Sequence, residues 1–162
     1  MDRSSRHDDD LYAWSQEQAD LLRDLARQGS GPSGLDLDNL ADEVEDLGRS
    51  ELDKAESHLR LFLLHLLKIA SAPDARPVEH WRAEAKVFHA GFRRAVTRSI
   101  LRKIDLDQVW QLAVGQAGAR LALAGDAIVA VPAHCPFALD ALLAAPPDLD
   151  AMAASLRDRQ PN

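Results

Sequence analysis

An apolar repeat in the middle of the chain constrains the fold more than any other feature. Between residues 52 and 69, apolar side chains recur in alternating steps of three and four: Leu52, Ala55, Leu59, Phe62, Leu66 and Ile69. This spacing places them along one side of an α-helix, as a seam that packs against other helices. Pro73 then stops the pattern, because proline cannot continue a helix. The repeat therefore predicts a long helix inside a helical bundle.

Helical periodicity continues on the N-terminal side of this repeat. Asp10 is a suitable N-cap, and the apolar stripe that follows it predicts a helix over residues 11–27. Leu40, Val44 and Leu47 give the next segment one apolar face, and Gly48 weakens the helix at that point. The segment that ends before Pro73 is therefore predicted to be either one long helix kinked at Gly48 or two consecutive helices.

The C-terminal half of the chain predicts further helices and no sheet. A third long helix is expected over residues 77–104, and a fourth after the cap Asp105, ending near Gly125. Short helices are expected over residues 136–144 and around residues 149–156. The strand-like run 127–131 is too short to form a sheet and is expected to be extended coil. The predicted fold class is all-α, a bundle of four principal helices plus short C-terminal helices.

Composition is that of one globular domain. The chain has 162 residues, of which 46% are hydrophobic and 28% charged, as in ordinary folded domains. We expect a disordered leader at residues 1–9, the bundle domain at 10–145, and a tail with a short amphipathic helix at 146–162. The sequence shows no apolar run long enough to span a bilayer and no signal-peptide core, so a cytoplasmic protein without membrane contact is expected.

Several stretches, in their order along the chain, resemble one bacterial family. The most specific are residues 42–51, Asp-Glu-Val-Glu-Asp-Leu-Gly-Arg-Ser-Glu, and residues 64–68, Leu-His-Leu-Leu-Lys. Residues 10–14, the pair at 81–82 and the Cys-Pro-Phe at 135–137 add to the pattern. Together they resemble the family named domain of unknown function twenty-nine, from about residue 10 to 144. The resemblance implies an all-helical domain and implies no particular activity.

The acidic run Asp42, Glu43, Glu45 and Asp46 is the first candidate site. Helical nucleotide pyrophosphatases hold magnesium with carboxylates in the pattern E-E-x-x-E and a later E-x-x-D. Here the run imitates the first half, and the second half is missing. A solvated helix face is the favoured interpretation, and no metal or cofactor is predicted. A divalent-metal-dependent hydrolase using Glu43, Asp46 and His65 remains the alternative.

Within this run, Glu43 differs from its acidic neighbours. On an ideal helix it lies about 70° from the centre of the face formed by Leu40, Val44 and Leu47, whereas the other three acids point farther away. A partly buried carboxylate needs a partner. We therefore predict a polar cluster between helices, with a tryptophan packing over it, formed by Glu43, His65, Arg82, and Trp14 or Trp81.

The third predicted helix is strongly basic, through Arg82, Lys86, Arg93, Arg94, Arg98, Arg102 and Lys103. Such a helix could bind phosphate groups, which gives a nucleic-acid accessory protein as a further alternative. Residues 36–56, however, carry nine acids against Arg49 and Lys54. Pairing of the acidic helix with the basic one is therefore favoured, and the net charge of −7 disfavours nucleic-acid binding.

No complete catalytic set stands out in the sequence. The expected function is that of a non-enzymatic interaction or regulatory protein, with another protein or a second copy of the chain as its partner.

Overall fold

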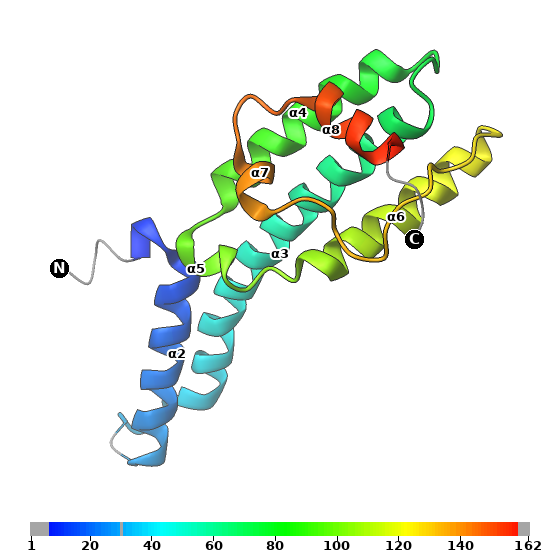
Figure 1. The fold of residues 1–162 in the computed structure, drawn as a ribbon. Helices are drawn as coiled ribbons and strands as arrows, with labels where there is room; N and C mark the ends of the chain where they lie inside the picture. The colour runs from blue at the N-terminus through cyan, green and yellow to red at the C-terminus, as the bar shows by residue number, and fades with distance from the viewer. Residues whose placement is uncertain (1–6, 30, 159–162) are drawn as a thin grey trace. The chain divides into compact units, whose positions relative to one another are not determined.

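The computed structural model of the protein describes residues 7–29 and 31–158. Within these ranges the chain forms helices and loops and contains no β-strand, which confirms the predicted all-α class. The helices are α2 (Leu11–Arg27), α3 (Leu37–Ser71), α4 (Val78–Ala95), α5 (Arg98–Leu101), α6 (Leu106–Leu123), α7 (Leu139–Leu143) and α8 (Leu149–Arg157) (Figure 1). Most of the expected disordered leader, residues 1–6, lies outside the described residues, and residues 7–9 form a helical turn.

The long helix α3 runs through Gly48 without interruption, over 35 residues. Of the two sequence-based alternatives, a single helix is therefore correct. It begins after Asp36, whose carboxylate accepts a hydrogen bond from the backbone N–H of Asn39 at 3.2 Å. The third predicted helix, in contrast, ends at Ala95 rather than near residue 104. Thr97 stops it by starting α5, where its side chain accepts from the backbone N–H of Ile100.

The chain divides into two compact units, and α3 contributes to both. Unit 1 comprises Met1–Ala55 and Ala95–Ile104, and unit 2 comprises Glu56–Arg94 and Asp105–Asn162.

In unit 1, α2 and the first part of α3 run side by side as a hairpin, the blue and cyan helices of Figure 1. The two helices bury small side chains. Ser15 and Ala19 are the buried residues of α2, and Ala41 and Gly48 are buried on α3. A Cβ atom added to Gly48 would collide with Oγ of Ser15, so the two backbones approach closely at this point.

Unit 1 also has a small core near the start of α2. Ala55, Ala95 and Ile100 are buried there, and Tyr12, Leu52, Val96 and Ile104 pack against them. Asp10 holds this region together through three hydrogen bonds, one of them from the backbone N–H of Ser99 at 3.4 Å. Its carboxylate accepts from the Ser99 hydroxyl at 2.5 Å and from the backbone N–H of Ala13 at 3.1 Å. Burial alone would raise the pKa of Asp10, but these hydrogen bonds outweigh it and lower that pKa.

Unit 2 contains the larger core. The predicted seam on the second part of α3 is buried. The residues between the seam positions are buried as well, so that residues 62–67 are buried on every side of the helix. Buried side chains from α4, α6 and α8 pack in the same unit: Trp81, Ala85, Phe92, Val109, Trp110, Ala113, Ala117, Leu121, Leu149, Ala153 and Leu156. Helix α8 falls in the segment expected as a tail, yet three of its side chains belong to this core.

Hydrogen bonds attach the extended segment after α6 to the helices of unit 2, the unit to which it also belongs. The Trp110 indole N–H donates to the carbonyl of Pro132 at 3.0 Å, and the backbone N–H of Val129 donates to the Ser71 hydroxyl at 2.9 Å. The His89 imidazole donates through Nε2 to the carbonyl of Leu142 at 3.0 Å, which holds the beginning of the C-terminal region against α4. Within the described residues, no helix combines the length and the apolar character needed to cross a bilayer.

Candidate functional site

Glu43 does not occupy the rim of a core, which corrects the prediction made for it. Its side chain is exposed on α3, and among the described residues it makes no hydrogen bond or ion pair. The reason is that α3 turns a different face toward α2. The prediction assumed that the large residues Leu40, Val44 and Leu47 face inward, whereas the buried face carries Ala41 and Gly48.

Glu45 and Asp42, which were predicted to point into water, are the acids that contact α2. Glu45 is half-buried, and its carboxylate accepts from the Arg23 guanidinium at 2.5 Å. The same guanidinium donates to Asp42 at 2.8 Å. Its hydrogen bonds with Glu45 and Asp42 raise the pKa of Arg23 above its ordinary value. Arg23 was missed at the sequence level, although it follows the buried Ala19 by one helical turn and so lies on the same side of α2.

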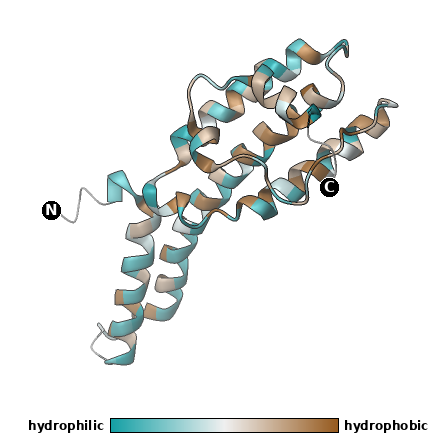
Figure 2. Ribbon diagram, in the orientation of Figure 1, coloured by the Kyte–Doolittle hydropathy of each residue, from teal (hydrophilic) through white to brown (hydrophobic). Residues whose placement is uncertain are grey.

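Because the hairpin closes through small residues, a row of larger apolar side chains stays outside. We call Leu40, Val44 and Leu47 of α3 the leucine stripe. Leu40 is 39% and Leu47 51% exposed, and Val44 is half-buried. Leu21 on α2 is a further exposed leucine of the hairpin, at 48%. Figure 2 shows hydrophobic and hydrophilic residues interleaved along the two helices of the hairpin. Exposed leucines repeated at helical spacing are typical of a surface that another helix covers.

Acidic side chains lie near the leucine stripe. Glu43 lies three residues after Leu40 and four before Leu47, so it stands on the same side of the helix as both. Asp46 lies farther around the helix from the stripe and is paired with Arg49 of the same helix at 3.1 Å. Between residues 36 and 53, eight acids face a single base, Arg49. The stripe thus has the acidic side chain of Glu43 beside its leucines and lies in a strongly acidic part of α3.

His65 lies in unit 2, where it is buried beside Phe88 of α4. The two rings stack with centroids 5.6 Å apart, and the His65 Nε2 is 3.9 Å from the Glu84 carboxylate. Nδ1 of His65 is buried and has no hydrogen-bond partner among the described residues. Burial, reinforced by the positive charges of Lys68, Arg120 and His80, lowers the pKa of His65 to about 4. The imidazole is therefore neutral at pH 7.

Arg82 and Trp81 have partners other than those predicted. The Arg82 guanidinium donates to Asp150 of α8 at 2.6 Å and lies 3.4 Å from Glu79. Trp81 is buried, and the Lys68 ammonium sits 4.2 Å from the centre of its ring. Trp14, in unit 1, is half-buried and meets the edge of the His7 ring at a centroid distance of 4.7 Å.

The predicted polar cluster of Glu43, His65 and Arg82 would join the two units and stays a prediction. Glu43 is an exposed residue of unit 1, whereas His65 and Arg82 have their contacts within unit 2. The alternative metal set of Glu43, Asp46 and His65 likewise draws on both units. Among the residues that the structure describes, no three His, Cys, Asp or Glu side chains are grouped so that they could hold a metal ion.

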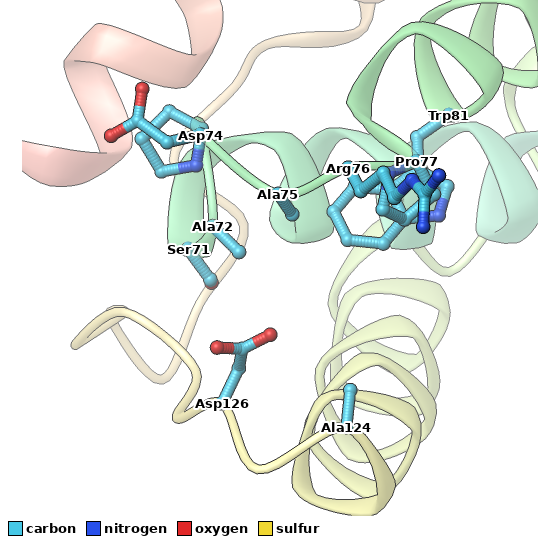
Figure 3. A pocket seen from close by; sticks show the side chains of 10 residues that line it. Ser71, Ala72, Asp74, Ala75, Arg76, Pro77, Trp81, Ala124 and Asp126 are labelled. Carbon is cyan, nitrogen blue, oxygen red and sulfur yellow. The ribbon is translucent and has the colours of Figure 1, made fainter.

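A hollow of about 540 Å³ lies in unit 2, between the loop that joins α3 to α4 and the end of α6. Figure 3 shows its lining, with Asp74, Arg76 and Trp81 from the loop and α4, and Asp126 from the segment after α6. Ser71 also lines it, but its hydroxyl is engaged with the Leu67 carbonyl and the Val129 N–H. These lining groups do not combine into a nucleophile, a base and an orienting partner.

Helix α4 carries a second exposed surface, on the side away from its buried residues. Ala83, Val87, Ala90 and Arg94 follow one another in steps of four, three and four, and all four are exposed. Val87, Ala90, Arg93 and Arg94 line a shallow hollow of about 470 Å³. The predicted pairing of the basic helix of unit 2 with the acidic run of unit 1 stays a prediction. Asp42, Glu45 and Asp46 pair with Arg23 or Arg49, and Arg82 pairs with acids of unit 2.

Comparison with known proteins bears on the fold and the family. A solved crystal structure of an α-helical protein of unknown function from Rhodospirillum rubrum superimposes with a TM-score of 0.84. The two chains are 36% identical, and the match covers 93% of this chain and 96% of the other. No curated protein matches the chain. The model of the family described as Domain of unknown function DUF29 matches residues 7–146. The chain therefore belongs to the DUF29 family, as its acidic stretch and its later Leu-His-Leu-Leu-Lys motif indicate.

Proposed function

We propose that the protein is a non-enzymatic interaction protein, and that the leucine stripe of the α2–α3 hairpin binds a basic amphipathic helix. The observation that carries this proposal is the exposure of Leu40 and Leu47 on a helix that already packs against α2 through its adjacent, small-residue face. Because the hairpin does not need these leucines to close, they are available to a partner.

The apolar part of the stripe supports a useful binding energy. Complete burial of a leucine side chain stabilises a complex by about 1.5–3 kcal/mol, so covering the exposed half of each leucine is worth on the order of 1 kcal/mol. A partner helix that covers Leu40, Val44 and Leu47 together would present its own apolar residues at the same spacing of three and four.

The charges around the stripe support a basic partner. Glu43 is exposed and makes no ion pair among the described residues, and it lies beside both leucines. Lysines or arginines that flank the apolar face of the partner would meet this carboxylate and its acidic neighbours. Complementary charge of this kind accelerates association and excludes acidic partners.

A designed peptide tests this proposal. The probe is a helical peptide with leucines at steps of three and four and lysines elsewhere, and its affinity is measured by isothermal titration calorimetry. The Leu47→Ser variant should bind the peptide roughly fivefold more weakly than the unmodified protein, because one apolar contact worth about 1 kcal/mol is lost. Leu112→Ser is the matched control, since Leu112 in unit 2 is also 51% exposed.

Circular dichroism must show that both variants keep the helical content of the unmodified protein. Equal losses for Leu47→Ser and Leu112→Ser would show that the peptide binds without using the stripe. Absence of binding to the unmodified protein at about 100 µM would remove the proposal.

A further inference from the structure

We propose that the basic helix bound by the leucine stripe is α4 of a second copy of this chain. The inference rests on the proposed function, because it names the helix that the stripe binds. Its basis is that two exposed surfaces of the same chain are complementary in shape and in charge.

The outward face of α4 has the features that the stripe requires. Its inner face, with Trp81, Ala85 and Phe92, is buried in unit 2, so the helix is already held in place. Its outer row is apolar at Ala83, Val87 and Ala90, and Val87 is 63% exposed. A helix that is ordered before it binds loses less conformational entropy on binding than a disordered segment would.

The shapes of the two surfaces are complementary, because one surface projects and the other is hollowed. The stripe presents long side chains, Leu40 and Leu47, whereas the outer row of α4 presents short ones. Around Val87 and Ala90 the short side chains leave the shallow hollow of about 470 Å³. Leucines projecting from one helix into the space above short residues of another form the usual packing of two helices.

The charges of the two surfaces are opposite. Arg93 and Arg94 border the hollow on α4, and neither takes part in an ion pair with the residues that the structure describes. On the stripe, Glu43 is likewise exposed and unpaired within those residues. Contact between the surfaces would bring these charges together, which an interface between two acidic surfaces could not do.

Both surfaces are exposed in a single chain, so each copy can offer its stripe and its α4 face to another copy at the same time. If two copies exchange these contacts reciprocally, they form a closed dimer with two equivalent interfaces. If the contact is repeated in one direction, it forms an open chain of copies. Both are self-association through the same pair of surfaces.

Sedimentation velocity on the purified full-length protein tests the inference first. Between about 1 and 100 µM at low salt, the average mass should rise with concentration from that of a monomer. At about 0.5 M salt the association should weaken roughly tenfold or more, because the contact contains several solvent-facing ion pairs. A protein that stays monomeric throughout this range overturns the inference.

Charge reversal then identifies the surfaces. Glu43→Lys makes the stripe more basic, and Arg94→Glu makes the α4 face more acidic. Each variant alone should remain largely monomeric, because the proposed contact would then bring like charges together at positions 43 and 94. A mixture of the two variants should associate again, because the reversed stripe of one fits the reversed α4 face of the other. The control Lys103→Glu alters an exposed base outside α4 and should self-associate normally.

The outcomes separate the two proposals. Self-association that persists in both single variants, or a mixture that stays monomeric, overturns the inference. If the unmodified chain is monomeric but binds the leucine–lysine peptide through Leu47, the inference fails and the proposed function stands. If a dilute, monomeric sample does not bind the peptide, the proposed function itself fails.

Discussion

Two glycines in the middle of helices have opposite surroundings, although the sequence alone does not distinguish them. At Gly48, the Ser15 side chain and the carbonyl oxygen of Tyr12 occupy the space that a Cβ would need. At Gly115 of α6, nothing lies within 4 Å of an added Cβ. A glycine in a helix costs about 1 kcal/mol relative to alanine, so the surroundings decide the sign of a Gly→Ala substitution.

We therefore expect Gly48→Ala to lower the free energy of unfolding by about 1–3 kcal/mol, because the hairpin must separate to admit the methyl group. Gly115→Ala should raise it by up to about 1 kcal/mol. Urea denaturation of the two variants provides the measurement. A stabilising Gly48→Ala would show that α2 does not pack closely on α3 at this position.

The lowered pKa of His65 leads us to expect that the protein loses stability in acid. Its pKa is lowered to about 4 in the folded protein by burial and by nearby positive charge, against an ordinary value of 6.5. Between these values the unfolded chain binds a proton that the folded chain does not, so stability is full above about pH 6.5 and declines as the pH falls toward 4. The Glu84 carboxylate, 3.9 Å away, favours the protonated form but does not outweigh burial.

Replacing His65 with methionine removes this titration while leaving a side chain of similar size. The unmodified protein should lose on the order of 1–3 kcal/mol of unfolding free energy between pH 7 and pH 4 through this residue. His65→Met should lose less over the same interval, as measured by urea denaturation at several pH values. Parallel pH profiles for the two proteins would mean that His65 is accessible to protons in the fold.

At the scale of elements, periodicity was sufficient to predict that helices form and was insufficient to predict which face each one buries. The seam from Leu52 to Ile69 was predicted correctly, because apolar residues cover that whole side of α3. Earlier in the same helix, either of two adjacent rows of side chains could face α2: the row that contains Leu40 or the row that contains Ala41. The sequence favours the larger residues, whereas the structure buries the small ones, since they allow the α2 and α3 backbones to approach.

The face that α3 buries decides which of its acids contacts α2. Once Ala41 and Gly48 face α2, Glu45 comes within reach of Arg23 and Glu43 turns to solvent. The pairing of Arg82 with Asp150 could not be predicted either, because the two residues are 68 positions apart and belong to different helices. Helical spacing predicts neighbours within one element, but contacts between elements depend on which faces meet.

The Arg23–Glu45 contact gives a prediction about the hairpin as an element. Glu45→Ala should destabilise the protein, because the half-buried carboxylate is the shortest link of Arg23 to α3. Glu43→Ala should change the free energy of unfolding by no more than about 0.5 kcal/mol, as is usual for a surface residue. Urea unfolding of the two variants compares them directly. A larger loss of stability for Glu43→Ala than for Glu45→Ala would indicate that Glu43 is partly buried, as the sequence predicted and the structure does not show.

For the whole molecule, charge is distributed unevenly among helices. The net charge is −7, and the first part of α3 is strongly acidic. On α4, Lys86, Arg93 and Arg94 are exposed together. Such a molecule repels a polyanion as a whole, while one of its faces attracts phosphate groups. The nucleic-acid alternative therefore depends on whether three clustered bases outweigh the net charge.

We expect the net charge to prevail, so that the protein does not bind duplex DNA or RNA at moderate salt. Each phosphate contact adds an interaction that salt weakens steeply, and the roughly three contacts that α4 could make are fewer than the 6–10 typical of firm binders. No aromatic side chain is exposed among Lys86, Arg93 and Arg94 to stack on unpaired bases. A gel-shift titration at about 50 and 200 mM salt measures this, with Arg94→Glu as the variant that should abolish any residual binding. Micromolar binding that weakens steeply with salt and disappears in Arg94→Glu would make the outward face of α4 a phosphate-binding surface, and a second copy of the chain would then have to compete with nucleic acid for it.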